Sequence, residues 1–278
     1  MTGTEEKKEK IPCSVEILTR NSAATLERCL DSVRDFAEII VLDGSSTDST
    51  RAIAARYGCI VAAQGERLEP DGAIADFSAV RNRGLRMSAY DWFLYIDSDE
   101  YLSAEAVEEM RAIIRDPAPH AHVWWQPRRY VLGRKVVMCA ITYPNRQIRF
   151  FHKRWVKEFI KPVHERIAVK PGAVIGCLAG LEYVPLAPLP EQQRRWDRYA
   201  QLEILMCSGL RRKKILKVFF RQIKMLALYT ARFARNLFVC RGVRMPFRYE
   251  WARCYDTIKF AGALLRLLLI STHLKNNP

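Results

Sequence analysis

Two carboxylates stand directly after an apolar run near the middle of the chain. Residues 91–100 read Asp-Trp-Phe-Leu-Tyr-Ile-Asp-Ser-Asp-Glu, and the unbroken apolar stretch 92–96 is typical of a strand buried on both faces of a parallel sheet. Asp97 and Asp99 point to the same side if the backbone there is still extended. Paired acidic oxygens suit a hard divalent cation, Mg²⁺ or Mn²⁺, that takes further ligands from a substrate diphosphate. A solvated turn before a helix N-terminus, where acidic residues are also favoured, is the alternative.

Three other polar positions are candidates for binding or chemistry. Asp43 follows a second apolar run and opens a loop rich in Ser and Thr, which could equally be a helix cap. Arg81 could reach a diphosphate or be an ordinary surface charge. Glu165 follows His164 between apolar residues, so this pair could handle protons in a reaction or form a hydrogen-bonded structural feature.

The segments that would position these residues alternate between strand and helix patterns. We expect strands at 14–19, 38–42 and 60–63, with a helix from 21 to 33 and another ending at Gly58 between them. This β-α-β-α-β order predicts a mainly parallel sheet with right-handed crossovers, whose ligands gather at the carboxyl ends of the strands. No G-x-G-x-x-G follows the first strand, which argues against a dinucleotide-dependent hydride-transfer enzyme.

The pattern changes after two more expected helices, at 74–87 and 104–115. Strand-like pieces broken by Pro and Gly follow at 123–131, 147–151 and 163–167, without long helices between them. We therefore expect an antiparallel extension of the sheet, where an acceptor site could be built.

Charge separates the chain into a nearly neutral body and a basic extension. Most of the net charge of +15 falls on residues 189–278, which hold 19 Lys and Arg against 5 Asp and Glu. A Pro-rich linker at 185–190 precedes them, so we expect a disordered tail at 1–10, a sheet domain at 11–188 and a helical extension at 189–278. An acidic surface is the partner to look for.

The expected extension is amphipathic and shows no evident membrane span. In the stretch 216–239, basic side chains fall on one helical face and apolar ones on the other. The basic set is Lys217, Arg221, Lys224, Arg232 and Arg235, and the apolar set is Phe219, Ile223, Leu226, Phe233 and Leu237. The apolar run 260–270 is about half as long as a membrane span. We expect an interfacial placement on a membrane, or else helices that pack on the sheet domain and expose Lys and Arg to water.

The cysteines and the N-terminus indicate a reducing compartment. All eight Cys are scattered singly, without a C-x-x-C pair or zinc spacing. Residues 1–10 are polar and lack the apolar core of a signal peptide. We therefore expect reduced thiols and a cytoplasmic protein.

Taken in order, these motifs resemble the family-2 inverting glycosyltransferases, which have the GT-A fold. The resemblance covers roughly residues 12–168 and rests on the strand before Thr19-Arg20-Asn21 and on residues 29–32, 39–50, 81–84 and 92–100. Within the family the chain is most similar to the bacterial lipopolysaccharide-core type, through Gln147-Ile148-Arg149-Phe150 and Val163-His164-Glu165.

The resemblance implies an α/β fold, with a mixed, mainly parallel sheet sandwiched by helices and followed by the helical extension. It also implies transfer of a sugar, with inversion, from a nucleotide-diphosphate donor, usually UDP-linked, to an acceptor hydroxyl. The implied acceptor is a lipid-linked glycan such as a lipopolysaccharide core, met at an anionic surface on the inner face of the cytoplasmic membrane.

Residue roles follow from the same resemblance. Asp43 matches the acid that contacts the base, Thr19 flanks the nucleotide, and Arg81 joins the nucleotide site. Asp97-Ser98-Asp99 matches the D-x-D motif, in which Asp97 lies by the nucleotide and the metal, and the last acid holds Mg²⁺ or Mn²⁺. The Glu-Asp pair in which many members place their base is missing between 101 and 188, so we assign the base to Glu165 as a substitute.

Two readings from other classes stay open. A nucleic-acid-binding protein would explain the basic extension but would not need a metal site. A non-catalytic sugar-nucleotide-binding protein would keep the fold but need not keep both Asp97 and Asp99. Because both acids are present, we favour an active, metal-dependent enzyme that has no nucleic-acid partner.

Overall fold

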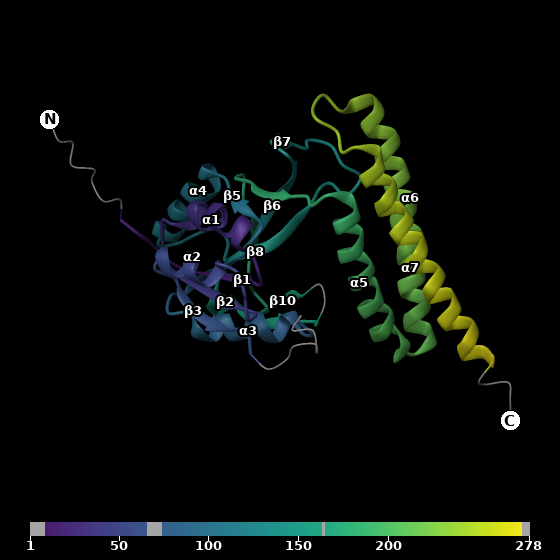
Figure 1. Cartoon of the computed structure of the whole chain (residues 1–278), viewed down its shortest axis with the longest axis horizontal. Helices are drawn as coiled ribbons and strands as arrows, with labels where there is room; N and C mark the ends of the chain where they lie inside the picture. The colour runs from purple at the N-terminus through teal and green to yellow at the C-terminus, as the bar shows by residue number, and fades with distance from the viewer. Residues whose placement is uncertain (1–8, 66–73, 163–164, 274–278) are drawn as a thin grey trace. The chain divides into compact units, whose positions relative to one another are not determined.

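The chain forms two compact units (Figure 1). The computed structural model describes residues 9–65, 74–162 and 165–273. The first unit contains residues up to 129 together with 144–185, and the second contains 130–143 together with the residues from 186 onward. The segment 130–143, which we expected within the sheet domain, thus belongs with the C-terminal helices, and the boundary near 188 stays a prediction.

The first unit is built on one large mixed sheet. Its strands are β1 (Ile11–Thr19), β2 (Phe36–Asp43), β3 (Ile60–Ala63), β4 (Trp92–Asp97), β5 (Tyr101–Leu102), β6 (Val123–Leu132), β8 (Arg146–His152), β11 (Ile175–Cys177) and β12 (Glu182–Pro185). The spatial order is β3-β2-β1-β4-β8-β6-β12-β5. Strands β3, β2, β1 and β4 are parallel, and β8 lies antiparallel between β4 and β6. The expected parallel sheet is confirmed, as is its antiparallel extension through β8 and β6; of the third expected piece, 163–167, residues 163–164 lie outside the described residues and 166–167 belong to a separate two-stranded sheet.

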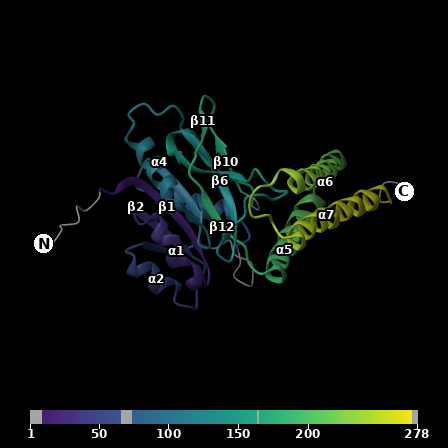
Figure 2. The same ribbon diagram turned by 90° about the horizontal axis from the view of Figure 1, so that it is seen from above.

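Helices pack on both faces of this sheet, and Figure 2 shows α1, α2 and α4 near β1 and β2. The helices of the first unit are α1 (Ala23–Val33), α2 (Thr50–Arg56), α3 (Phe77–Met87) and α4 (Ala104–Arg115). Helices α1, α2 and α4 bury their apolar faces against alternate residues of β1, namely Cys13, Val15 and Ile17. On the other face, Val80 of α3 packs with Leu18. This alternation follows from the two-residue repeat of a strand, and it leaves Glu16 on the α3 side.

A smaller strand pair lies against the antiparallel half. Strands β9 (Val156–Ile160) and β10 (Arg166–Val169) pair antiparallel after the short 3₁₀ helix η1 (Lys153–Trp155). Phe159 of β9 packs in one cluster with Phe93, Tyr95 and Phe151. The cluster holds β9, which ends at Ile160, on the same side of the sheet as α3, where Asn82 of α3 donates to the Phe159 carbonyl at 2.9 Å.

The second unit consists mainly of three helices. They are α5 (Leu189–Ser208), α6 (Arg212–Val239) and α7 (Phe247–His273), with the short strand β7 (Lys135–Val136) pairing to the end of β6. A disulfide joins Cys139 to Cys240, so the expectation of reduced thiols does not hold for these two residues. Across the described parts of the chain, no helix is both long enough and apolar enough to cross a membrane.

Helix α6 differs from the two clean faces that we expected. Lys217, Arg221, Lys224 and Arg235 are exposed as expected, but Arg232 is half-buried and its Nη1 donates to the Ile141 carbonyl at 3.1 Å. Of the apolar set, Ile223 and Leu237 are exposed, whereas Phe219, Leu226 and Phe233 are half-buried. Part of the apolar face is therefore buried by packing within the unit.

Candidate active site

The carboxyl ends of β1 and β2 bring Thr19 and Asp43 together. The two strands are parallel and in register, with Thr19 opposite Asp43. Thr19 Oγ1 donates a hydrogen bond to Asp43 Oδ1 at 3.0 Å, and the Ser46 backbone N–H donates to Asp43 Oδ2 at 3.0 Å. Asp43 is buried and so held in one orientation. Strand patterns predicted that Asp43 lies at a strand end; the roles of Thr19 and Asp43 at a nucleotide stay predictions.

The loops around this pair are held by side-chain hydrogen bonds. Asn21 and Ser45 adopt left-handed backbone conformations, with φ of 50° and 59°. Asn21 Oδ1 accepts from the Thr47 backbone N–H at 2.8 Å, which ties the two loops together. Gln64 Nε2 donates to the Thr19 carbonyl at 2.9 Å, from below the loop. Strand-end loops fixed in this way need little reordering to meet a ligand.

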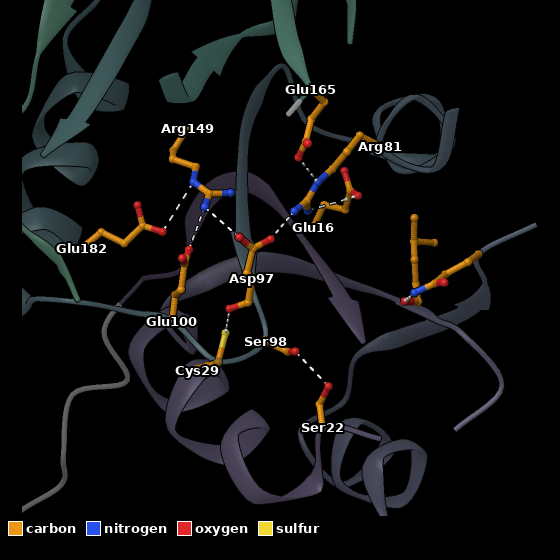
Figure 3. A network of polar contacts seen from close by, with 12 residues as sticks. Glu16, Ser22, Cys29, Arg81, Asp97, Ser98, Glu100, Arg149, Glu165 and Glu182 are labelled. Atoms are coloured by element: carbon orange, nitrogen blue, oxygen red, sulfur yellow. Dashed lines mark hydrogen bonds and ion pairs between the residues drawn. The ribbon is translucent and has the colours of Figure 1, made fainter. Parts of the chain in front are cut away.

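Asp97, the last residue of β4, lies at the same edge, one strand away from Thr19. Its Oδ2 accepts from Arg149 Nη2 at 2.9 Å, and its Oδ1 is paired with Arg81 (Figure 3). Arg81 comes from α3 and Arg149 from β8, and both are almost fully buried. Burial alone would raise the pKa of Asp97, but the attraction of Arg149 and Arg81 outweighs it and holds this pKa well below its ordinary value. Asp97 is therefore a carboxylate at every physiological pH.

The two guanidinium groups are also fixed by an aromatic ring. Tyr95 precedes Asp97 on the same face of β4, and its ring centre lies 4.7 Å from the Arg81 Cζ and 4.6 Å from the Arg149 Cζ. Phe159 packs edge-on against Tyr95, with ring centroids 5.0 Å apart. Cation–π contacts on one ring keep both arginines aimed at Asp97.

Glu165 joins the site through Arg81. Its Oε1 lies 3.5 Å from Arg81 Nε, and its side chain is 17% exposed. The structure thus gathers Glu165, Arg81 and Asp97 in one cluster, although they are far apart in the sequence. His164, which we considered together with Glu165, lies outside the described residues, and the base assignment itself stays a prediction.

Glu16 is a buried acid that the sequence analysis did not single out. It is fully buried, with Oε1 3.5 Å from Arg81 Nη1. Burial raises the pKa of Glu16 to about 8, against the opposing effect of Arg81 and with added repulsion from Glu165 and Asp97. A Cβ at Gly84 of α3 would lie 2.5 Å from Glu16 Cδ, so glycine is required there to make room for the acid. In the sequence, Glu16 could have been noticed as a charged residue within a mainly apolar strand.

Arg149 extends the cluster toward the antiparallel half of the sheet. Its Nη2 donates to Glu100 Oε2 at 2.7 Å, and its Nε lies 3.5 Å from Glu182 Oε1. Arg128 of β6 pairs with the same two acids, Glu100 and Glu182. All four side chains are at least nine-tenths buried. The sequence motif contained Arg149 without assigning it a role, and it gave no indication of Arg128 or Glu182.

The geometry bears on the expectation that Asp97 and Asp99 hold Mg²⁺ or Mn²⁺. Within the described residues, no group of three or more His, Cys, Asp and Glu is arranged to hold a metal ion. Both Asp97 oxygens are engaged by arginines, and Asp99 is half-buried in the turn after β4. One protein carboxylate, waters and a substrate diphosphate form a donor set that fits Mg²⁺ or Mn²⁺. Direct ligation by Asp97 stays a prediction, because it requires an ion pair to open.

Sequence relatives were found over much of the chain. The family described as "Glycosyl transferase family 2" matches residues 14–219. A TPR repeat-containing protein of Synechococcus elongatus is 36% identical over 155 residues, which are 55% of this chain and 35% of that protein. An uncharacterized glycosyltransferase of Rickettsia bellii is 29% identical over 144 residues, 51% of this chain and 46% of that protein. The chain thus spans about half, or less, of the length of these curated relatives.

Two solved structures are also similar. S. aureus TarS in complex with UDP matches 89% of this chain and 80% of its own, with 18% identity and a TM-score of 0.46. Glucosyl-3-phosphoglycerate synthase from Mycobacterium tuberculosis, in complex with Mn²⁺, UDP and phosphoglyceric acid, matches 72% of this chain and 79% of its own. Its identity is 18% and its TM-score 0.46.

Proposed function

Because the chain belongs to glycosyl transferase family 2, we propose that it transfers a sugar from a nucleotide-diphosphate donor to an acceptor hydroxyl. The observation that carries the proposal is the convergence of two acidic sites at one sheet edge. Asp43 ends β2, Asp97 ends β4, and β1 with Thr19 lies between them in register with both strands. Ligands of open α/β sheets bind at this edge.

In this proposal the donor is a UDP-sugar that spans the three strand ends. Asp43, held by Thr19 and the Ser46 N–H, accepts a hydrogen bond from the base. Asp97 faces the ribose and diphosphate, positioned by Arg81 and Arg149. Both arginines are already paired with acids, so they do not present unpaired positive charge to the donor.

The reaction proposed is a displacement with inversion at the anomeric carbon. A Mg²⁺ or Mn²⁺ held by Asp99 would neutralise charge that develops on the departing diphosphate. Glu165 accepts the proton of the attacking acceptor hydroxyl, since its carboxylate, 17% exposed, is held 3.5 Å from Arg81 Nε in the same cluster as Asp97. Arg81 keeps this carboxylate and Asp97 in one fixed relation.

For the acceptor we propose a lipid-linked glycan, such as a lipopolysaccharide core, reached at the inner face of the cytoplasmic membrane. The charge of the extension supports this choice, because residues 189–278 hold 19 basic against 5 acidic residues. Anionic lipid headgroups attract such a segment.

Nucleotide binding tests the site directly. We expect UDP to bind the full chain in isothermal titration calorimetry, and Asp43→Asn to weaken binding about tenfold through one lost charged hydrogen bond. Asp116→Asn, an exposed acid in the turn after α4, is the matched control and should bind as the wild type does. Equal affinity in Asp43→Asn and the control would remove Asp43 from the site.

A further inference from the structure

Helix α7 leaves a row of large apolar side chains exposed. The row consists of Phe247 (63% exposed), Trp251 (57%), Tyr255 (46%), Ile258 (47%), Leu265 (46%) and Leu269 (57%). Successive members are three, four or seven residues apart, so they share one face of the helix. The opposite face is covered, since the fully buried Leu264 packs with Ile215 of α6 and Cys207 of α5.

The row, here called the α7 stripe, is continuous along the helix. Gly262 fills the seven-residue gap, and a Cβ there would meet no atom within 4 Å. At the end of α6, Phe238 is 87% exposed and Val239 is 66% exposed. Isolated exposed apolar residues are ordinary, but a continuous row of this length indicates a binding surface.

Basic side chains flank the α7 stripe. Arg248, Lys259 and Arg266 are exposed on α7, at helical positions beside the row. The two acids of α7 are withdrawn: Glu250 is buried and accepts from the Ile141 N–H at 3.0 Å, and Asp256 is half-buried. Helix α6 contains no acidic residue at all. Lys259 is ion-paired with Asp197 of α5, so the charge beside the apolar row that α6 and α7 leave without an exposed acid comes from Arg248 and Arg266.

This charge pattern favours one of two partners that could cover the stripe, a second copy of the chain or an anionic bilayer. The spacing from Trp251 to Leu269 would also suit a coiled-coil seam with a second copy. A second copy, however, would place Arg248 and Arg266 beside further basic residues, with no exposed acid on α6 or α7 to pair with them, and Asp197 of α5 is already paired with Lys259. An anionic bilayer offers acyl chains for the apolar row and phosphates for its flanks. Trp and Tyr are also favoured at the boundary between these two layers.

We propose that the α7 stripe docks the protein on an anionic lipid bilayer, with the helix lying in the plane of the interface. The proposal adds to the proposed function, because docking on a bilayer would bring the site to a lipid-linked acceptor, and it rests on that function in this respect. The observations that support it come from the surface of the second unit alone. It also moves the contact from the basic residues of α6, which we expected from the sequence, to α7.

Flotation of the full chain tests the docking. Vesicles of phosphatidylcholine alone and of phosphatidylcholine with phosphatidylglycerol are compared, at low and high salt. We expect flotation with the anionic vesicles only, and weaker flotation in high salt. Trp251→Ser with Leu265→Ser, and separately Arg248→Glu with Arg266→Glu, should each lower the bound fraction about tenfold. The matched controls are Ile60→Ser with Val174→Ser and Arg86→Glu with Lys157→Glu, which change exposed residues of the first unit and should float as the wild type does.

Two further measurements distinguish loss of docking from loss of catalysis and from dimerisation through the stripe. Donor hydrolysis in solution without vesicles should be equal in the wild type and the α7 variants, so a failure of catalysis is distinguished from a failure of docking. Sedimentation should show the same mass for all of them. Absent flotation of the wild type, or full flotation of Trp251→Ser with Leu265→Ser, overturns the proposal. A wild-type dimer that this double variant converts to a monomer assigns the stripe to a second copy and overturns it as well.

Discussion

Arg149 of β8 holds Asp97 of β4 through a hydrogen bond of 2.9 Å between Nη2 and Oδ2. The pair exists because β4 and β8 are antiparallel neighbours in register, which places Arg149 beside Tyr95 and its guanidinium at the strand end. Arg149 is thus a positioning residue for the acid that we expect to face the donor. The relationship links the parallel half of the sheet, where the nucleotide would bind, to the antiparallel half.

Arg149→Met should destabilise the protein strongly. The change leaves Glu100 and Glu182, which are 5% and 1% exposed, with less compensation for their buried charge. Breaking a buried pair in this way costs about 3–5 kcal/mol in the free energy of unfolding, which urea denaturation measures. Arg51→Met, at an exposed position of α2, is the control and should change that free energy by less than about 0.5 kcal/mol. Equal stability of the two variants would show that the cluster contributes nothing.

The stability of the wild type should fall as the pH rises through the range in which Glu16 titrates. Its pKa is raised from 4.5 to about 8 on folding, so the folded state holds the proton more tightly than the unfolded chain. The resulting stabilisation is complete below pH 4.5 and is lost as the pH rises toward 8.

Glu16→Gln does not titrate and isolates this effect. Between pH 5 and pH 8 the free energy of unfolding of the variant should rise relative to the wild type by roughly 3–4 kcal/mol, at about 1.4 kcal/mol for each pKa unit. Glu158→Gln, at an exposed position of β9, should follow the wild type at every pH. Parallel pH profiles for Glu16→Gln and the wild type would mean that Glu16 is not raised.

Asp99→Asn should abolish turnover without unfolding the protein. Asp99 is half-buried, so the melting temperature should stay nearly unchanged, while loss of one charge contact to the departing group lowers turnover by about two orders of magnitude or more. Asp91→Asn, at an exposed position before β4, is the control. Retained activity in Asp99→Asn, or full activity of the wild type in EDTA, would contradict the metal role.

Glu165→Gln should keep donor binding and lose transfer. The amide preserves the shape of the side chain but cannot take the proton of the acceptor hydroxyl. UDP titration and a transfer assay on the same preparation separate the two effects, and a melting curve checks for loss of the 3.5 Å contact with Arg81. Unimpaired transfer would return Glu165 to a structural role and leave the base unassigned.

Strand and helix patterns predicted the part of the site that depends on local sequence. The apolar run before Asp97 and the acid that closes the run before Asp43 identify two strand ends, and parallel topology alone then brings these ends to one edge. The helix from Asn21 to Val33 was predicted from the spacing of its apolar residues and is observed as Ala23–Val33. Such features are encoded within a few residues of each other.

The ion-pair cluster could not be predicted in the same way. Arg149 reaches Asp97 and Glu100 from about fifty residues away in the sequence, and Arg128 and Glu182 meet only when β6 and β12 are neighbours in the sheet. The disulfide between Cys139 and Cys240 joins residues 101 apart and has no local signature either. Side-chain contacts of this kind depend on register, which strand patterns do not fix between distant segments.

Release of a nucleotide diphosphate shows directly whether the protein is a cation-dependent glycosyltransferase. The full chain is incubated with UDP-sugars and other nucleotide sugars, with and without Mg²⁺ or Mn²⁺, and both the wild type and Asp99→Asn are assayed. We expect cation-dependent release from at least one donor by the wild type, increased by a glycan acceptor that gains the sugar with inverted configuration, and about a hundredfold less release by Asp99→Asn. No release from any donor, with UDP failing to bind, would contradict it.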